Sequence, residues 1–263
     1  MEGACQRKCN FLDKYPSALK YIVNSQNGGY GQGNNIGIRA ADAPVVLIMN
    51  PDVRLDGTTP ARICERFAQD SRLLLLGMQQ RMGNGRKGRS LLWAGLLPPG
   101  FVAKALLWAC NASGLYFSKW QCVQGSCFAV RKAPFEKIGL FDERIFMYGE
   151  ERDIHSRLIK SDLGYMAVDW GMSYRHLTDE RTLNLATSMK QWQVAVAQCK
   201  RNGIPASIYW KRLKRSIELN LFWNRLKTFG RETASIRGIR SQLVAIETQL
   251  GEATRNEGKG GPS

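Results

Sequence analysis

The sequence predicts an α/β domain with a helical C-terminal appendage. Short apolar runs alternate with helical segments up to about residue 180, which is typical of a sheet covered by helices. Beyond Leu183 the strand signals stop, while helical patterns and basic residues continue. Apolar residues make up 44% of the 263 residues, which is ordinary for a globular protein with a sizeable core.

The chain divides by composition into four parts. These are an unpatterned N-terminus (1–20), the α/β core (21–182), a basic helical region (183–250) and a disordered tail (251–263). The tail is polar and ends in a glycine-rich stretch, so it buries too little apolar surface to fold.

Each element of the core has a local reason. Val45–Met49 is a continuous apolar run typical of a buried parallel strand, and Pro51 ends it because proline cannot donate to a ladder. Asn27–Gly37 concentrates Asn and Gly, which favours a loop that leads into a helix start. Apolar patterning predicts strands at 21–23, 73–78, 122–130, 165–168 and 172–175, and helices at 61–68, 134–138 and 153–160.

One apolar stretch, Leu91–Cys110, has nearly the length of a membrane span. Pro98, Pro99 and Gly100 interrupt it, and Lys104 lies inside it. We therefore expect two short apolar pieces that are buried or lie at an interface. The first residues contain no apolar region of the kind that signal peptides carry.

The net charge and the cysteines indicate which partners and which cell compartment the protein suits. Thirty-eight basic against 22 acidic residues give a net charge of +16 and a pI near 9.8. This surplus favours a polyanionic partner, which means nucleic acid, an anionic membrane face or a phosphate-bearing substrate. The seven cysteines form no CxxC pair, so neither a zinc site nor a disulfide framework is expected, and a reducing cytoplasm fits best.

A cluster of carboxylates stands out in this basic chain. Because clustered carboxylates raise one another's pKa, such a group suits general-base chemistry. The alternative is a solvated acidic loop and helix cap, with Asp153 and Arg157 as an i,i+4 ion pair. Interleaved aromatic side chains, among them Phe146, argue against full solvation. The five carboxylates are Asp142, Glu143, Glu150, Glu151 and Asp153.

A second candidate for a functional site, Asn50-Pro51-Asp52, follows the predicted strand at 45–49. Open α/β sheets place ligand chemistry at the carboxyl ends of strands, where Asp52 could hold a cation that bridges a diphosphate. A simple turn is the alternative, because all three residue types form turns. His176 follows another predicted strand, and a lone histidine is more often structural than a ligand.

Four segments in this order resemble inverting family 2 glycosyltransferases, in the branch of bacterial rhamnosyltransferases of O-antigen and capsule assembly. The resemblance implies the GT-A fold, with a mixed, Rossmann-like sheet. Residues 27–37 are similar to the family's donor loop, and residues 47–53 to its D-x-D strand. Residues 124–131 resemble its acceptor-side strand, and residues 138–154 with Arg157 its catalytic segment.

The resemblance implies direct displacement of a nucleoside diphosphate by an acceptor hydroxyl, with inversion at the anomeric carbon. Glu151 would be the base, with Glu150 and Asp142 beside it. The donor side would comprise Asn27, Gly28, Gly33, Asn34, Asn50, Asp52 and Arg157, and the acceptor side Gly125, Ser126 and Tyr148. Asp52 and His176 would hold Mg²⁺ or Mn²⁺. The donor would be dTDP-rhamnose or a UDP-sugar, and the acceptor a lipid-linked glycan.

The chain departs from the family pattern at three places. Asn50 stands for the first Asp of the D-x-D motif, and Glu150-Glu151 stands for the usual Glu-Asp pair. Only about twenty residues precede the glycine-rich segment, whereas the family begins with a strand-helix-strand unit that holds the nucleotide. We therefore expect an N-terminally incomplete sheet and weak donor binding by this chain alone.

The helical pattern at Ile208–Phe229 combines basic and apolar side chains. Such an amphipathic helix is typical of contact with an anionic leaflet. It predicts a cytoplasmic protein, peripheral on the inner face of the cell membrane. The alternative is a helix packed on the catalytic domain. The residues are Lys211, Arg212, Lys214 and Arg215, with Trp210, Leu213, Ile217, Leu221, Phe222 and Leu226.

Two competing functions remain open. The net charge and the loop Arg81–Arg89 favour a nucleic-acid-binding module. Against it, no helix-turn-helix, zinc or RNP-like pattern is present, and the acidic cluster would repel a phosphate backbone, so we expect no nucleic acid partner. A catalytically inactive remnant of a glycosyltransferase is the other possibility.

Overall fold

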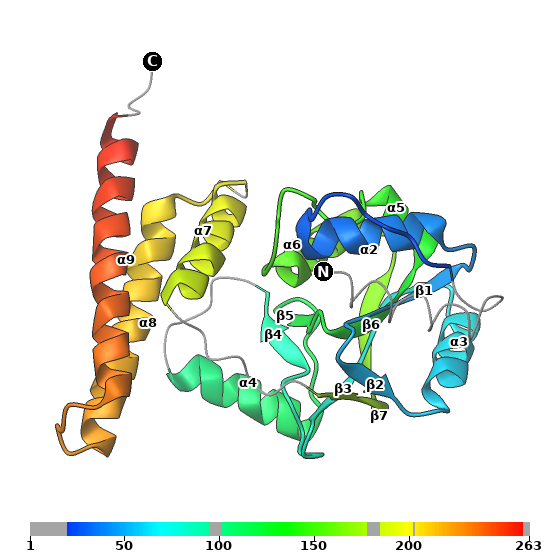
Figure 1. The fold of residues 1–263 in the computed structure, drawn as a ribbon, viewed down its shortest axis with the longest axis horizontal. Coiled ribbons are helices and arrows are strands. Elements are labelled where there is room, and N and C mark those ends of the chain that lie inside the picture. Colours follow the sequence, from blue (N-terminus) through cyan, green and yellow to red (C-terminus); the bar gives the residue numbers. More distant parts are fainter. Residues whose placement is uncertain (1–19, 95–100, 178–184, 202, 260–263) are drawn as a thin grey trace, which may run out of the picture.

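The computed structural model describes residues 20–94, 101–177, 185–201 and 203–259. In these residues a five-stranded sheet lies between helices, and three further helices form a separate group at the C-terminal side (Figure 1). This arrangement confirms the predicted α/β core with a helical appendage. The predicted lack of a strand-helix-strand unit before the glycine-rich segment concerns residues 1–19, which lie outside the described residues.

The main sheet is mixed. Its strand order is β1-β6-β3-β7-β2, in which β3 and β7 are parallel and the other pairs are antiparallel. A second, two-stranded sheet pairs β4 with β5. The strands are β1 Val45–Met49, β2 Val53–Leu55, β3 Leu73–Met82, β4 Leu91–Trp93, β5 Gln121–Val123, β6 Cys127–Arg131 and β7 Tyr165–His176.

Helices cover both faces of the main sheet. Side chains of α2, α5 and α6, such as Ile38, Phe135 and Ile154, form the core on one face. On the other face α3 contributes Ile63 and Phe67. The helices are α2 Gly29–Ala40, α3 Thr59–Gln69, α4 Phe101–Ser113, α5 Lys132–Lys137, α6 Glu150–Ser161, α7 Leu185–Arg201, α8 Ala206–Lys227 and α9 Ala234–Lys259.

Strand β1 differs from the predicted buried parallel strand. Within the described residues it is an edge strand that pairs only with the antiparallel β6. Val46 and Ile48 pack into the core on one face, while Val45 and Leu47 pack on the other. The strand is apolar throughout because both faces are covered, and that composition carries no information about the direction of its neighbour.

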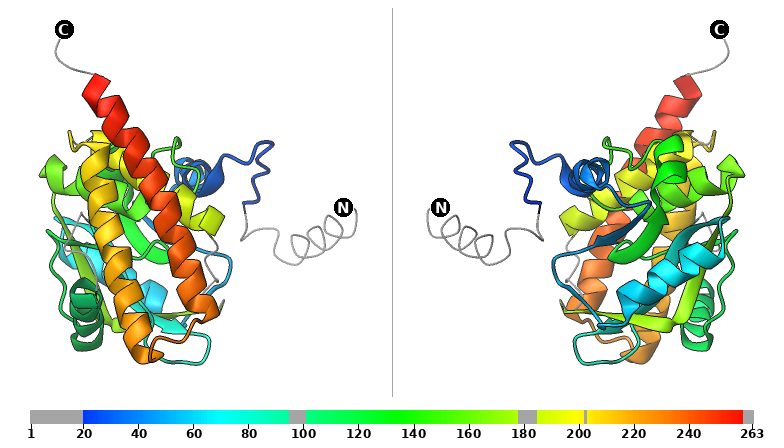
Figure 2. Two further views of the ribbon diagram at one scale, coloured as in Figure 1. Left: turned by 90° about the vertical axis from the view of Figure 1, so that its left-hand side faces the viewer. Right: turned by 90° about the vertical axis from the view of Figure 1, so that its right-hand side faces the viewer.

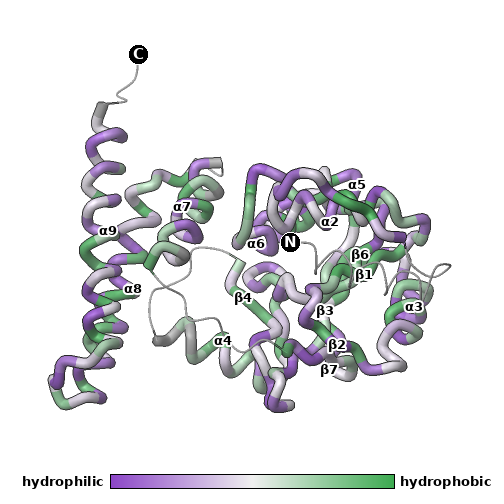
Figure 3. Tube along the Cα trace, viewed as in Figure 1, coloured by the Kyte–Doolittle hydropathy of each residue, from purple (hydrophilic) through white to green (hydrophobic). Residues whose placement is uncertain are grey.

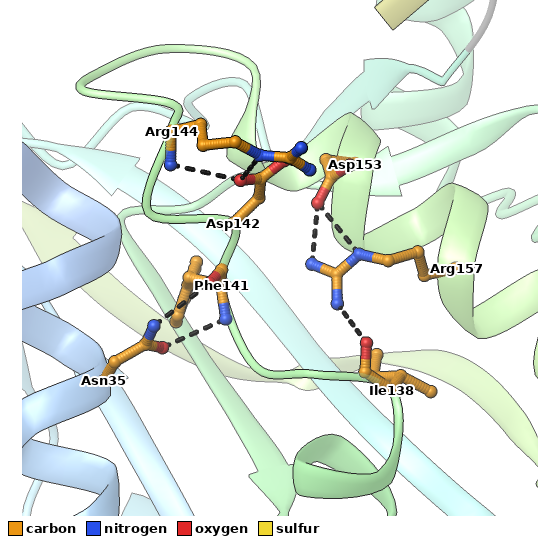
Figure 4. Close-up of polar contacts among 7 residues, drawn as sticks. All are labelled: Asn35, Ile138, Phe141, Asp142, Arg144, Asp153 and Arg157. Atoms are coloured by element: carbon orange, nitrogen blue, oxygen red, sulfur yellow. Dashed lines mark hydrogen bonds and ion pairs between the residues drawn. The ribbon is translucent and has the colours of Figure 1, made fainter. Parts of the chain in front are cut away.

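The glycine-rich segment is helix α2, where the sequence predicts a loop. Gly29, at φ +88°, begins the helix, and a Cβ there would lie 1.9 Å from the carbonyl oxygen of Phe146. The ring of Tyr30 packs edge-on against Phe141 at 5.5 Å between centroids. The buried Asn35 side chain bonds both the backbone N and O of Phe141 at 3.0 Å (Figure 4). These tertiary contacts outweigh the low helix propensity of glycine.

Other boundaries also differ from the prediction. Residues 20–28 contain no strand, β7 is continuous where two strands are expected, and β5 and β6 are separated at residues 124–126. Helix α9 extends to Lys259, through most of the predicted disordered tail. Its last turns are held because the carboxylate of Glu257 accepts a hydrogen bond from the backbone N of Ser207 at 3.1 Å.

The C-terminal helices bury part of the predicted amphipathic surface. Helices α8 and α9 lie side by side (Figure 2), and α7 packs against both. Trp210 is buried and meets the ring of Trp192 at 6.3 Å, and Leu213 and Ile217 pack into the same core. The buried apolar face of the first half of α8 is therefore packed against α7 and α9, whereas the alternative expects it to pack on the catalytic domain. No helix in the described parts of the chain is long and apolar enough to cross a membrane.

Candidate active site

Three strands bring the predicted donor and acceptor residues to one edge of the sheet. The C-terminal end of β1 lies beside the start of β6, where Asn50 N donates to the carbonyl of Ser126 at 2.9 Å. The end of β7 lies beside the residues after β1, where Leu177 N donates to the carbonyl of Asp52 at 2.8 Å. Ser126 and His176 therefore lie close to Asn50 and Asp52, although the three segments are far apart in the sequence.

Asp52 and His176 face each other directly. His176 Nε2 lies 3.3 Å from Asp52 Oδ1, and the adjacent Val53 pairs with His176 in the β2–β7 ladder. Carboxylate and imidazole groups are suitable ligands for Mn²⁺, so the pair fits a divalent cation. The described residues contain no group of three or more metal-ligating side chains. A cation here would therefore need further oxygen ligands from a diphosphate or from water.

Glu151, in the first turn of α6, points to the loop before β6. Its Oε1 accepts a hydrogen bond from Gly125 N at 3.1 Å. A Cβ on Gly125 would lie 2.6 Å from the same oxygen, so only glycine allows this approach. The contact joins the predicted base to the predicted acceptor-side segment.

Glu150 differs from its neighbour in burial. It is only 5% exposed, and its Oε1 accepts a hydrogen bond from Tyr148 N at 2.9 Å. Burial, with the nearby Glu151 carboxylate adding to it, raises the pKa of Glu150 to about 7. Two adjacent carboxylates in unlike surroundings are typical of sites that divide acid and base roles.

The turn before α6 has an unusual backbone. Tyr148 has φ +72° and Gly149 has φ +107°, so two successive residues are left-handed. For a tyrosine this conformation is costly, and such strain gathers at functional turns. The turn leads directly into α6, whose first residues are Glu150 and Glu151.

Two tyrosines, the partly buried Tyr30 and the buried Tyr174, contact the predicted acceptor-side residues Gly125 and Ser126. Tyr30 donates to the carbonyl of Gly125, and the hydroxyls of Tyr174 and Ser126 are 2.7 Å apart. Tyr174 also reaches Gln80 Oε1 at 3.4 Å. Burial raises the pKa of Tyr30 and Tyr174 well above the usual range, so both stay protonated donors. The sequence analysis does not predict the contacts of Tyr174 and Gln80. Both are buried polar residues in strands of the main sheet, and such a position can indicate a side chain that supports a site.

Arg157 and Asp142 each make hydrogen bonds and ion pairs with other residues of the protein. Arg157 binds the Asp153 carboxylate at 2.6 and 2.9 Å and the Ile138 carbonyl at 2.6 Å, so it ties α6 to the preceding loop (Figure 4). Asp142 holds the guanidinium of Arg144 at 2.8 and 2.9 Å (Figure 4). These contacts explain both residues without a ligand, and a diphosphate contact by Arg157 or a catalytic role of Asp142 stays a prediction.

The remaining donor-side candidates lie at or near the start of α2. Asn27 accepts a hydrogen bond from Gly29 N, and Asn34 bonds the carbonyl of Tyr30 within the helix at 2.8 Å. Gly28 lies against the side chain of Gln32, whereas a Cβ on Gly33 would meet nothing within 4 Å. Their contact with a donor also stays a prediction.

Comparison with known proteins shows which families and structures this chain is similar to. Residues 5–139, just over half of the chain, match the family model described as Glycosyl transferase family 2. The chain is 29% identical over 181 residues to the N-acetylglucosaminyl-diphospho-decaprenol L-rhamnosyltransferase of Mycobacterium tuberculosis, in the strains CDC 1551 / Oshkosh and ATCC 25618 / H37Rv. That match covers 60% of this chain and 57% of the relative, so the chain spans little more than half of the relative's length.

Solved structures are similar in fold. GalNAc-T7 with UDP, GalNAc and Mn²⁺ has a TM-score of 0.56 at 14% identity, over 76% of this chain and 39% of that one. The mannosyltransferase PcManGT of Pyrobaculum calidifontis, in complex with GDP-Man and Mn²⁺, has a TM-score of 0.54 at 12% identity, over 97% and 72%. These likenesses confirm the GT-A fold. The match to the family model shows that the chain belongs to glycosyl transferase family 2.

Proposed function

We propose that this chain transfers a sugar from a nucleotide-sugar to a hydroxyl of a lipid-linked glycan, with inversion at the anomeric carbon. The observation that carries the proposal is the contact between Glu151 and Gly125 beside the Asp52–His176 pair. Gly125 is followed by Ser126, whose carbonyl is bonded to Asn50, so the two halves of the site are directly connected. The family membership supports the reaction class.

In the proposed reaction, Glu151 accepts the proton of the acceptor hydroxyl as its oxygen attacks the anomeric carbon. A new C–O bond forms while the bond to the nucleoside diphosphate breaks, and the diphosphate leaves from the opposite side. Gly125 N holds the Glu151 carboxylate, which orients it toward the acceptor side. A divalent cation between Asp52, His176 and the diphosphate would neutralise the charge of the leaving group.

The mycobacterial relative favours the donor dTDP-rhamnose, with UDP-sugars as the next candidates. Its name also favours an acceptor with a diphospho-lipid, which fits a place in O-antigen or capsule synthesis on the cytoplasmic, inner face of the membrane. The Mn²⁺ in both structural neighbours supports Mn²⁺ or Mg²⁺ as the cofactor.

The test is a transfer assay with the full chain, dTDP-rhamnose or UDP-sugars, and an N-acetylglucosaminyl-diphospho-lipid acceptor. We expect a product whose mass increases by one sugar, formed only with Mn²⁺ or Mg²⁺. A thermal-shift screen of nucleoside diphosphates runs in parallel. If no nucleotide shifts the melting temperature and no product forms, the chain is the inactive remnant instead.

A further inference from the structure

The middle of the chain carries only positive charge. Between Asp70 and Glu136 there is no acidic residue, although the whole chain contains 22. This segment includes β4, α4 and β5. Its nine basic residues are Arg72, Arg81, Arg86, Lys87, Arg89, Lys104, Lys119, Arg131 and Lys132. A surface built from it has no anion of its own to neutralise these cations.

Within this segment, helix α4 and the turn after it expose large apolar side chains. At 100° per residue, the exposed positions 105, 106, 108, 109, 112 and 113 form one continuous arc of α4. Trp108 is 73% exposed at one border of the arc, and Leu106 is 54% exposed at the other. Leu115, Phe117 and Trp120 continue the exposed surface beyond the helix. We call the five exposed apolar residues the α4 face: Leu106, Trp108, Leu115, Phe117 and Trp120.

The opposite side of α4 is fixed to the core, so the direction of the α4 face is set. The side chain of the buried Asn111 accepts hydrogen bonds from Ser90 N at 2.7 Å and Leu91 N at 3.1 Å. Trp93 Nε1 donates to the carbonyl of Ala103 at 2.9 Å. In Figure 1, α4 lies along the lower margin of the molecule, with β4 and β5 above it, and Figure 3 shows apolar positions along it.

Exposed cations border the α4 face. Lys87 Nζ bonds the carbonyl of Ala112 at 3.1 Å, which brings the basic loop Arg81–Arg89 to the C-terminal end of α4. Arg86 and Arg89 of that loop are exposed, as is Lys119 beside Trp120. Tryptophan and aliphatic side chains bordered by Lys and Arg match the boundary between lipid phosphates and acyl chains.

We propose that the α4 face is the surface by which this protein docks on an anionic lipid leaflet. The proposal rests on the proposed function, because a lipid-linked acceptor must be reached at a membrane. Helix α6 connects the two sites: Arg152 Nε donates to the carbonyl of Trp93 at 3.0 Å, and His155 contacts the carbonyl of Ser118. The docking surface is thereby attached to the helix that carries Glu151.

The first experiment is flotation of the full chain with vesicles of phosphatidylcholine alone or mixed with phosphatidylglycerol. We expect binding only to the anionic vesicles, and at least a fivefold loss of bound protein in Trp108→Ala/Trp120→Ala. The matched control is Phe222→Ala/Phe229→Ala, which removes two exposed aromatics of the α8–α9 region and should bind as wild type. Circular dichroism verifies that each variant is folded.

Equal binding of wild type and the Trp108/Trp120 variant would overturn the proposal, and so would loss of binding in the Phe222/Phe229 variant alone. Arg86→Gln/Lys119→Gln should remove the preference for anionic vesicles. Lipids with brominated acyl chains measure how deeply a tryptophan enters the bilayer, because bromine quenches the fluorescence of a nearby indole. Trp108→Phe should keep binding but lose a measurable part of that quenching, and unchanged quenching would show that Trp108 stays in water.

Two readouts separate this proposal from the proposed function. Vesicle binding needs no sugar nucleotide, and donor binding needs no vesicle. If the chain binds dTDP-rhamnose but the α4 face does not mediate vesicle binding, only the docking proposal is wrong. If vesicle binding depends on the α4 face but no nucleotide binds, the docking surface stands and the proposed function is wrong.

Discussion

The acceptor side and the donor side of the site are built differently. On the acceptor side, Glu151 is held by a backbone N–H, Glu150 is buried, and tyrosines support the Gly125–Ser126 loop. On the donor side, the facing pair Asp52 and His176 is the main polar feature among the described residues. A backbone N–H of the protein thus positions Glu151, the proposed base, whereas the proposed donor site would be completed by a cation and a diphosphate.

The largest effect is expected at the base. Glu151→Gln keeps the shape and the hydrogen bond from Gly125 but cannot accept a proton. We expect kcat to fall by about 10³-fold with little change in KM for the donor, because general-base catalysis is worth that much. Initial rates at varied donor concentration measure both constants. A loss of less than about tenfold would mean that Glu151 is not the base.

The next effect concerns stability and pH. Because burial raises the pKa of Glu150 from 4.5 to about 7, the folded state binds more protons than the unfolded state between these values. The free energy of unfolding should therefore fall as the pH rises from 4.5 to 7, by up to about 3 kcal/mol. Urea titrations at several pH values measure it. In Glu150→Gln the fall should be absent, and an unchanged pH profile would contradict the assignment.

Gly125→Ala tests the close contact on the acceptor side. The new Cβ would displace the Glu151 carboxylate, and a misplacement of this size is expected to lower kcat by about 10²-fold. The matched control is Gly37→Ala in α2, where a Cβ meets nothing within 4 Å. The control should keep full activity and gain about 0.5–1 kcal/mol of stability through helix propensity. Comparable kcat values in the two variants would show that the contact does not matter.

Asp52→Asn tests the donor side. The amide is a weaker metal ligand, so we expect the Mn²⁺ concentration for half-maximal activity to rise by about tenfold. Titration of Mn²⁺ in the transfer assay measures this shift. Saturating Mn²⁺ should restore most of the rate, which separates a lost ligand from a lost base. An unchanged Mn²⁺ requirement would remove Asp52 from the cation site.

Local patterns predicted most elements of the fold. Pro51 marks the end of β1 correctly, and part of the acidic segment, from Glu150 onward, lies at the start of α6, while its catalytic role stays a prediction. The sequence could not predict that Gly29–Gly37 is helical, because the contacts of Asn35 with Phe141 span more than a hundred residues. The engagement of Arg157 by Ile138 and the support from Tyr174 are likewise tertiary contacts.

The C-terminal region also shows that a sequence pattern can predict an element without predicting its neighbours. The basic and apolar residues of α8 predict a helix correctly, but the periodicity cannot say which neighbour covers its apolar face. In the structure, Trp210 is covered by α7 and α9. The second half of α8 keeps Phe222 and Leu226 exposed, and a further exposed aromatic surface lies on α4, in the stretch that the sequence predicts to be buried or at an interface.

Sugar transfer with inversion by a base on α6 can be tested directly from the anomeric configuration of the product. The full chain is supplied with dTDP-rhamnose, and the isolated glycolipid is examined by NMR. We expect a configuration opposite to that of the donor, in a product that forms with wild type and nearly disappears with Glu151→Gln. A product that retains the donor's configuration would contradict inversion.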